Sequence, residues 1–418
     1  MAHARALAAQ MPEGRRHYLA HCADRYRFAV TLAAGLTSGR TGLLPSTFNA
    51  TVASQLKAFA EDAFVVTDDP RLATDLPLLM FPDESPAPAD DEPIPAIPAD
   101  HPVAWVFTSG STGDPVPHRK TWGKLVANVR AERGELGLAA DTPFAVLGTV
   151  PPQHMYGFET TVLMPLLCGG QLVAERPFFP TEITERLAAL PAPRLLVTTP
   201  FHLRNLLESG QAVPAADRVV SATAPLDVGL ARRAEAAFGC PLLEIYGSTE
   251  TSQLATRRTL DGPQWRLFPN VCLSQRDDAC WASGGHVEAP MPLADVIAID
   301  GPRAFRLCGR NSDLVNVAGK RSSVGYLSAQ LLAVEGVRDG AFFMPDTAPA
   351  DDIGRPAALA VAPGMSARQV LAGLRERIDP VFLPRPLILL DQLPRNATGK
   401  LPREVCDRLL SEHREAAP

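Results

Sequence analysis

The sequence lacks several features that would mark other protein classes. It contains no apolar run near the roughly 18–20 residues that a membrane helix needs, so we expect no transmembrane segment. Its first residues lack a sustained apolar core, so we expect no cleaved signal. Its 40 Lys and Arg do not outnumber its 46 Asp and Glu, and the net charge is −6. A basic surface for nucleic acid is therefore not expected, although an acidic small substrate needs only a few local cations.

Cysteine pairs are also missing. The seven cysteines include no CxxC spacing and their number is odd, which argues against a disulfide framework or a structural zinc site and favours a reducing, cytoplasmic location.

What is present is typical of a globular protein. Hydrophobic residues make up 46% of the 418 residues and charged residues 21%, and the length predicts two domains or three. The stretch 1–36 has helical spacing, and 63–66 is a short apolar run. The segment 81–102 is acidic and rich in proline, so it predicts an extended connection and not a helix or central strand.

After residue 102, short apolar runs alternate with stretches of helical spacing. This alternation predicts an α/β fold with mostly parallel sheets covered by helices, in which ligands bind beyond the carboxyl ends of the strands. The expected strands are 103–107, 144–150, 195–198, 219–222 and 242–246, and the expected helices are 121–134, 158–167, 200–208 and 228–238.

A second change in composition near residue 310 predicts a domain boundary. We expect a large domain over 1–311 and a small α+β domain over 312–418. The expected elements of the small domain are helices at 323–332 and 366–378 and strands at 337–343, 357–361 and 387–390.

A loop rich in serine, threonine and glycine, TSGSTGDP, follows the first of these strands. Its glycines free the backbone to wrap an anion and its hydroxyls add donors, although such a loop can also be an ordinary polar turn. It does not have the GxxxxGK[ST] pattern of a P-loop. The candidate anion-binding residues are Thr108, Ser109, Gly110, Ser111, Thr112 and Gly113.

The motif EIYGSTE ends the strand near residue 246. Thr249 can bond a phosphate or carboxylate, Glu250 can hold a hard cation such as Mg²⁺, and Tyr246 offers a flat face to a purine. The motif also fits a plain strand end with a capping threonine and a solvated glutamate.

Together, these two motifs resemble those of the adenylate-forming superfamily, which includes acyl-CoA synthetases, peptide-synthetase adenylation domains and luciferases. Further segments that resemble family motifs follow in order over residues 103–403: VSATAPLD at 220–227, Asp295 with Arg310, LVNVAGKR at 314–321 and LPRNATGKLPR at 393–403. The resemblance implies a large α/β domain with a shortened N-terminal portion and a small mobile C-terminal lid.

The resemblance also implies a reaction in two steps. A carboxylate attacks the α-phosphorus of ATP with Mg²⁺ present, and a thiol of coenzyme A or of a carrier protein's phosphopantetheine then displaces AMP. Lys400 would offset the charges of the two anions, and Gly319 would lie near the thiol after the lid rotates. Catalysis would involve Lys400, Thr249, Glu250 and His154. ATP would contact the loop at 108–113, Thr223, Ala224, the segment Glu244, Ile245, Tyr246, Gly247, Ser248 and Thr249, then Asp295, Arg310 and Lys400, and Glu250 would hold the metal.

The segment PPQHMYG resembles the family's P-x-x-H-x-x-G, which places His154 near the acyl carboxylate. No acidic residue occurs between Phe144 and Phe158, which disfavours an amino acid as substrate. The acyl pocket would be lined by His154, Tyr156, Phe158, Phe201, Ser221, Ala222 and Gly247.

The compact length is similar to that of hydroxybenzoate ligases of aryl-polyene and xanthomonadin-type pigment pathways, which deliver the acid to an acyl carrier protein. Two alternatives stay open, namely an acyl-CoA synthetase for a fatty or β-hydroxy acid and an inert nucleotide-binding partner protein. The chain departs from the family at Val116, where a lysine is usual and for which Lys120 is a candidate replacement. It departs again at Ser312, where the hinge usually has Asp or Lys.

Overall fold

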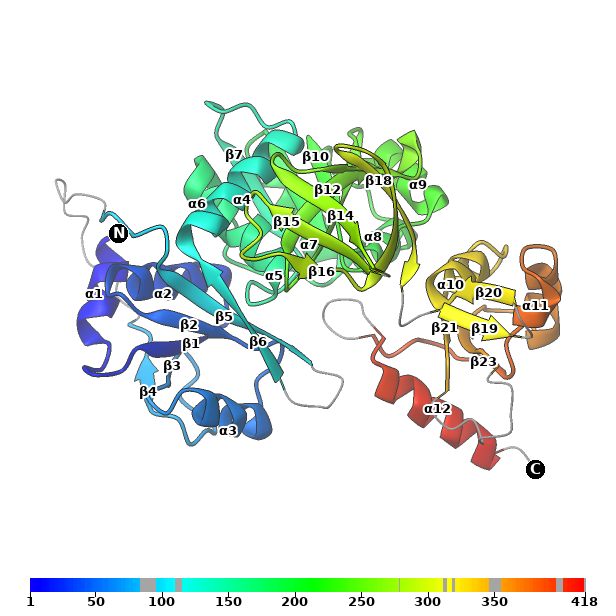
Figure 1. The fold of residues 1–418 in the computed structure, drawn as a ribbon, viewed down its shortest axis with the longest axis horizontal. Coiled ribbons are helices and arrows are strands. Elements are labelled where there is room, and N and C mark those ends of the chain that lie inside the picture. The colour runs from blue at the N-terminus through cyan, green and yellow to red at the C-terminus, as the bar shows by residue number, and fades with distance from the viewer. Residues whose placement is uncertain are drawn as a thin grey trace.

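The structure is a computed structural model that describes residues 1–82, 95–109, 115–277, 279–310, 314–317, 320–345, 355–395 and 401–416. It confirms the predicted α/β class, with sheets that are largely parallel. Figure 1 shows an N-terminal sheet at one side, a larger sheet with its helices in the centre, and the C-terminal elements at the opposite end.

The N-terminal sheet has six strands in the order β4-β3-β1-β2-β5-β6, all parallel except the antiparallel pair β5 and β6. The helix-like range 1–36 contains two helices, α1 and α2, and the sequence missed the strand β1 that forms between them after Pro12 and Gly14. The elements are α1 (Ala2–Gln10), β1 (His17–His21), α2 (Arg25–Thr37), β2 (Thr41–Leu44), α3 (Ala50–Phe59), β3 (Phe64–Thr67), β4 (Leu78–Met80), β5 (Pro102–Ser109) and β6 (Pro115–Thr121).

The central sheet has nine strands in the order β17-β18-β13-β12-β11-β10-β9-β7-β8. Strands β8, β7, β9, β10 and β11 run parallel, and the others are antiparallel. The strands are β7 (Phe144–Gly148), β8 (Gly170–Leu172), β9 (Arg194–Thr198), β10 (Arg218–Ser221), β11 (Leu242–Ser248), β12 (Ser252–Arg258), β13 (Gln264–Leu267), β17 (Asp295–Gly301) and β18 (Ala304–Arg310), with a separate small sheet of β14 (Val271–Arg276), β15 (Ala279–Gly284) and β16 (Met291–Pro292).

Helices cover both faces of the parallel strands, because successive strand residues point to opposite faces. Leu147, Leu196 and Val219 pack with α7, α8 and α9 on one face. Their neighbours Val146 and Val220 pack with α4 and α6 on the other. The helices are α4 (Trp122–Glu135), α5 (Met155–Gly157), a π-helix (Phe158–Leu163), α6 (Met164–Cys168), α7 (Pro180–Ala188), α8 (Pro200–Glu208) and α9 (Val228–Phe238), with a 3₁₀ turn at Thr259–Asp261.

The C-terminal part builds its own sheets and cores. Its three-stranded sheet has the order β21-β22-β23, and Leu327, Leu331 and Val370 from its helices pack against the sheet. All five elements predicted for this part are confirmed to within a few residues. The elements are β19 (Leu314–Val317), β20 (Lys320–Ser323), α10 (Val324–Leu332), β21 (Asp339–Phe343), β22 (Ala357–Val361), α11 (Ala367–Arg375), a 3₁₀ turn (Pro380–Phe382), β23 (Leu387–Leu389) and α12 (Arg403–Ala416).

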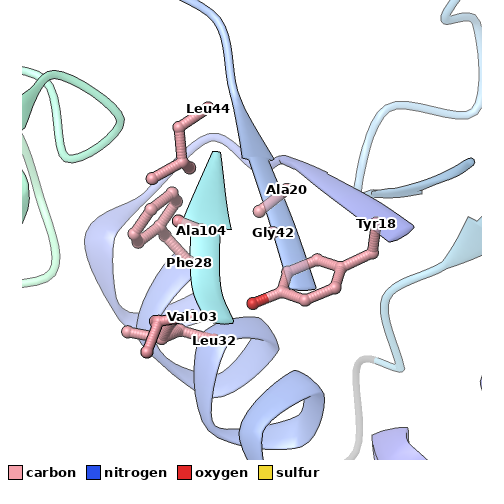
Figure 2. A pocket seen from close by; sticks show the side chains of 8 residues that line it. All are labelled: Tyr18, Ala20, Phe28, Leu32, Gly42, Leu44, Val103 and Ala104. Atoms are coloured by element: carbon pink, nitrogen blue, oxygen red, sulfur yellow. The ribbon is translucent and has the colours of Figure 1, made fainter. Parts of the chain in front are cut away.

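A small apolar cavity lies between α2 and the N-terminal sheet (Figure 2). The ring of Tyr18 occupies one side of it and approaches two glycines so closely that a Cβ at Gly35 would lie 2.3 Å from the ring and one at Gly42 would lie 3.3 Å from it. Packing of the tyrosine therefore requires glycine at Gly35. None of the eight lining residues is a predicted site residue, so we assign the cavity to packing.

Arg25 ties α2 to the central sheet. It is 1% exposed, and burial lowers the pKa of its guanidinium to about 10. Its five hydrogen bonds, of 2.9–3.1 Å, all end on uncharged oxygens, namely the carbonyls of Gly148, Val150, Val173 and Glu175 and the hydroxyl of Thr161. The arginine thereby fixes the chain that leaves β7 for the PPQHMYG segment.

Replacing Arg25 by Met should lower the free energy of unfolding by about 4 kcal/mol, because four carbonyls, two of them fully buried, lose their donor. Chemical denaturation would measure the loss. Arg27→Met is the matched control: that arginine is 31% exposed and pairs with Asp24 and Asp68, so its loss should cost less than about 1 kcal/mol. Equal losses for the two variants would contradict the role given to Arg25.

Candidate active site

The predicted site residues gather where the parallel strands of the central sheet end. Strands β9, β10 and β11 end at Thr198, Ser221 and Ser248. The register pairs Ser221 with both Thr198 and Glu244. The adjacent β6 hairpin strand of the N-terminal sheet reaches the same place, because Lys120 bonds the turn after β11.

The turn that carries Thr249 and Glu250 joins β11 to β12. The Thr251 hydroxyl lies 3.1 Å from that of Ser248 and accepts from the Ser248 N–H at 3.3 Å. The strands approach so closely that a Cβ at Gly247 would lie 2.3 Å from the Ser252 carbonyl oxygen. Ser252 itself has a φ of +64°, a conformation that costs energy outside glycine. The glycine of YGSTE is therefore required by the turn itself.

Glu250 offers an ionised carboxylate at this turn. Burial raises its pKa, but hydrogen bonds from its own N–H and from Ser248, with the nearby His118 and Lys120, outweigh burial, so the pKa lies below its usual value. Its Oε1 lies 3.8 Å from Nε2 of His118, and the same Nε2 lies 3.1 Å from the Thr108 hydroxyl. The side chain is 36% exposed. An exposed, ionised oxygen donor fits a hard cation such as Mg²⁺.

The ribose-side residues also come together. Tyr246 on β11 donates its hydroxyl to Oδ2 of Asp295 at 2.7 Å. Asp295 begins β17, and the register places Arg310 directly opposite it on β18. The tyrosine ring packs against Trp265 and Phe305, with centroids 5.7 and 5.6 Å away. One strand, β11, therefore carries the candidate ribose side and leads directly into the candidate cation turn.

The side chain of Glu244, which was predicted to contact ATP, is engaged elsewhere. Its Oε1 accepts from Nε of Arg257 at 2.6 Å and from the Thr259 hydroxyl at 2.5 Å, and the residue is 4% exposed. The carboxylate is thus held inside the protein by two donors. At Glu244 only the backbone remains for an adenine, next to the buried Ile245.

The segment that contains Thr223 and Ala224 follows β10. Thr223 has a φ of +77°, which is rare for a β-branched residue and marks stored strain. Both residues are half-buried. Such strain tends to occur at ligand sites, where the surrounding structure holds the backbone in place.

On the acyl side, the structure separates residues that the sequence grouped. Tyr156 is half-buried, and its hydroxyl donates to the carbonyls of Val220 at 2.9 Å and Thr198 at 3.3 Å. Phe158 is 0% exposed and packs edge-on against Phe28, so its predicted place in the acyl pocket is corrected to the core.

The other acyl-side candidates surround the strand ends. His154 precedes α5, where a Cβ at the following Gly157 would lie 2.0 Å from the Pro151 carbonyl oxygen. Ser221 is 0% exposed, and Ala222 is also buried. Phe201 lies at the start of α8 and is half-buried.

Several predicted residues lie outside the described residues, namely Gly110, Ser111, Thr112, Gly113, Ser312, Gly319 and Lys400. For Ser109 and Arg310, only the backbone is described, in β5 and β18.

Lys120 does not replace the usual loop lysine in the expected way. It is 1% exposed, and its ammonium donates to the Glu250 carbonyl at 3.1 Å and to the Ser252 hydroxyl at 3.2 Å. Burial lowers its pKa, against the attraction of Glu159, Glu288 and Glu250. The charge therefore lies beneath the turn and inside the protein.

Comparison with known proteins decides the family. A model of the AMP-binding enzyme family matches residues 5–303. The chain belongs to this family. It is therefore an AMP-forming acid–thiol ligase, as the sequence predicted.

Relatives of this AMP-binding enzyme include two 4-coumarate–CoA ligases. The protein from Halorhodospira halophila is 30% identical over 70% of this chain and 73% of its own length. The one from Rhodobacter capsulatus is 33% identical over 55% of this chain, and the match spans only 57% of that protein.

Solved structures of similar fold cover almost the whole chain. ATP-bound MatB from Rhodopseudomonas palustris has a TM-score of 0.81 at 20% identity and covers 99% of this chain and 92% of its own. O-succinylbenzoate coenzyme A synthetase from Bacillus subtilis in complex with AMP has a TM-score of 0.80 at 18% identity over 96% and 91% of the two chains. Within the described residues, every helix is too short or too polar to span a bilayer.

Sequence reasoning missed a buried polar cluster in this AMP-binding enzyme. Glu132 on α4 accepts from Thr160 at 2.6 Å and from Gln253 at 3.1 Å, and Glu159 accepts from Asn128 at 2.7 Å. Both glutamates are at most 1% exposed. Asn128 and Glu132 are four residues apart on α4 and so share one helix face, which is the only signal that the sequence offered.

Burial raises the pKa of Glu132 from 4.5 to about 7, against the hydrogen bonds from Thr160 and Gln253. Between these two values the folded chain keeps a proton that the unfolded chain has released, so stability falls as the pH rises. Glu132→Gln keeps the shape without this titration. It should flatten the decline and raise the free energy of unfolding at pH 8 by roughly 2–3 kcal/mol, with little change at pH 4.5.

Chemical denaturation between pH 4.5 and 8 checks this expectation. Glu208→Gln, at the exposed end of α8, serves as the control and should keep the slope of the unsubstituted chain. An unchanged slope in the Glu132 variant would show that its carboxyl is ionised throughout.

Proposed function

We propose that this AMP-binding enzyme activates an aryl carboxylic acid, preferentially a hydroxybenzoate, with ATP and passes the acyl group to a phosphopantetheine thiol. One observation carries the proposal. Strand β11 brings Tyr246, with Asp295 2.7 Å from its hydroxyl, and the turn bearing Glu250 to one end of the sheet. A nucleotide needs an acceptor such as Asp295 at its ribose and a cation-binding carboxylate such as Glu250 at its phosphates. Strand β11 and its turn bring both to one end of the sheet.

Each described residue then has a role that its chemistry permits. Asp295 would accept from ribose hydroxyls, and the Tyr246 ring would face the adenine. Glu250 would hold Mg²⁺, which supplies positive charge to offset that of the phosphates. Thr249 and Thr108 would donate hydroxyls to the phosphates. His118 would orient Thr108, since its Nε2 lies 3.1 Å from that hydroxyl.

An aryl acid is favoured by the acyl side and by the relatives. Tyr156 and Phe201 present aromatic rings near the strand ends, and His154 lies beside them in the chain. Relatives are named for 4-coumarate, and another, from an Arthrobacter species, is named for 4-chlorobenzoate. Both acids are aromatic. The names of these relatives specify coenzyme A. We propose a carrier protein as the acceptor here, because the short chain is similar in length to hydroxybenzoate ligases that use one. We also propose that the reaction takes place in the cytoplasm.

The two steps need Lys400 and Gly319 to face the site in turn. We propose that residues 1–311 form the body and 312–418 a rotating lid, with Ser312 at the hinge. A contact across this boundary supports a defined lid orientation. Arg204 on α8 lies 3.6 Å from Asp339 on β21, and Asp339 is also bound by Arg395 at 2.6 Å.

Exchange of labelled pyrophosphate into ATP tests the proposal directly. We expect 4- or 3-hydroxybenzoate to support exchange at least tenfold better than fatty or β-hydroxy acids of similar size. The preferred acid is then offered with coenzyme A and with a carrier protein. Preference for an aliphatic acid would overturn the substrate class, and bound ATP without exchange for any acid would favour the inert nucleotide-binding alternative.

Lys400→Ala should reduce adenylate formation by about a hundredfold or more, because the two anions then meet without a cation between them. Thiol transfer from a supplied acyl-adenylate should remain within about twofold. Lys57→Ala, an exposed lysine of α3, is the control for both rates. If both steps fall together, the two lid orientations are wrong.

A further inference from the structure

Lys120 joins the two large sheets beneath the turn at Glu250. The lysine comes from β6 of the N-terminal sheet, and the turn belongs to the central sheet. Its ammonium donates to the backbone carbonyl of Glu250 and to the hydroxyl of Ser252. Its surface is 1% exposed, so a nucleotide in the site would not touch it.

On the interior side of this contact lies an acidic residue, Glu159. Ser252 lies close enough to Glu159 to lower the pKa of that carboxyl, and Asn128 donates to the same carboxylate at 2.7 Å. Because Lys120 is a donor only, the Ser252 oxygen accepts from it and the Ser252 hydrogen is left for Glu159. The Lys120–Ser252 bond therefore lies beside Glu159, which is on the π-helix.

This arrangement holds the backbone that carries the Glu250 side chain. A bond to the Glu250 carbonyl holds the peptide that follows it, and a bond to Ser252 holds the residue with φ of +64°. With Gly247 packed against the Ser252 carbonyl, both ends of the turn are anchored. A charged donor makes such bonds stronger than neutral ones.

We propose that Lys120 is a positioning residue for the cation site: it acts through the turn, and by holding Glu250 in place it raises affinity for ATP with Mg²⁺. The proposal rests on the proposed function. Lys120 therefore differs in role from the usual loop lysine, whose position is occupied by Val116. Its ammonium supports the metal-binding turn from inside the protein and does not contact the phosphates.

A purely structural role would be neutralisation of Glu159 in the core. The two roles make different demands. Neutralisation becomes unnecessary when Glu159 is also made neutral, whereas support of the Glu250 carbonyl requires a donor whatever the state of Glu159. The pair of variants K120M and K120M/E159Q separates them, since the amide oxygen of glutamine can still accept from Asn128.

The experiment measures ATP binding by titration calorimetry, with Mg²⁺ and with EDTA, and thermal unfolding of the same samples. K120M should lose about tenfold or more of the affinity for ATP with Mg²⁺, and affinity in EDTA should change less than threefold. K124M is the matched control: Lys124 donates to the Gly285 carbonyl at 2.8 Å and not to the turn, so it should bind as the unsubstituted chain does.

The double variant K120M/E159Q decides between the roles. We expect it to regain most of the thermal midpoint lost in K120M but not the Mg²⁺-dependent affinity. Recovery of both would overturn the positioning role and leave Lys120 as a core counter-ion, and unchanged binding in K120M would also overturn it. If the unsubstituted chain binds no ATP at all, the proposed function fails as well. Failure of the positioning role alone is recognised by normal ATP binding in the unsubstituted chain.

Discussion

The close approach of β11 and β12 at Gly247 is the constraint on which the rest of the site depends. Two backbones pass so near that a single methyl group at Gly247 would lie 2.3 Å from an oxygen. This proximity forces Ser252 to a positive φ and turns the chain sharply at residues 249–251. Because β11 also carries Tyr246, the same constraint fixes how the candidate ribose residues stand relative to the candidate cation residue.

The turn is held from the interior of the protein by the ammonium of Lys120, which lies among buried acidic residues. Isolated buried charges are costly. Burial and the neighbouring Glu132 raise the pKa of Glu159 to about 8, against the attraction of Lys120 and the Ser252 hydrogen bond. The Oε2 of Glu132 and the side-chain oxygens of Asn128 and Gln253 are buried without a hydrogen-bond partner within the described residues, so a negative charge on Glu132 would add a further cost there. Burial therefore keeps the charge on these acids low, and the Lys120 ammonium offsets the charge that remains.

The sequence predicted the parts of the site that local patterns encode. The ranges 200–208 and 228–238 are helices to the residue, and the motifs lie at strand ends, because turn chemistry and periodicity are local properties. Tertiary partners were not predictable in this way. Nothing local distinguishes the Glu244 carboxylate, bound by Arg257, from one that faces a nucleotide, or Phe158 in the core from Tyr156 at a strand end. The strand β1 was missed because five residues with two histidines lack the alternation of a half-buried strand.

The contact of Arg204 with Asp339 shows how a proposed lid can be held without being locked. Asp339 accepts two short bonds from Arg395, at 2.6 and 2.8 Å, within the C-terminal part itself. Its contact with Arg204 is longer, at 3.6 Å, and Arg204 also lies 3.5 Å from Asp227. If the proposed lid turns away, each charge therefore keeps a partner on its own side. Breaking the bridge leaves no buried charge unpaired, so its cost is that of a surface ion pair, about 1 kcal/mol or less. A lid that visits two orientations in every turnover requires contacts of this strength between itself and the body.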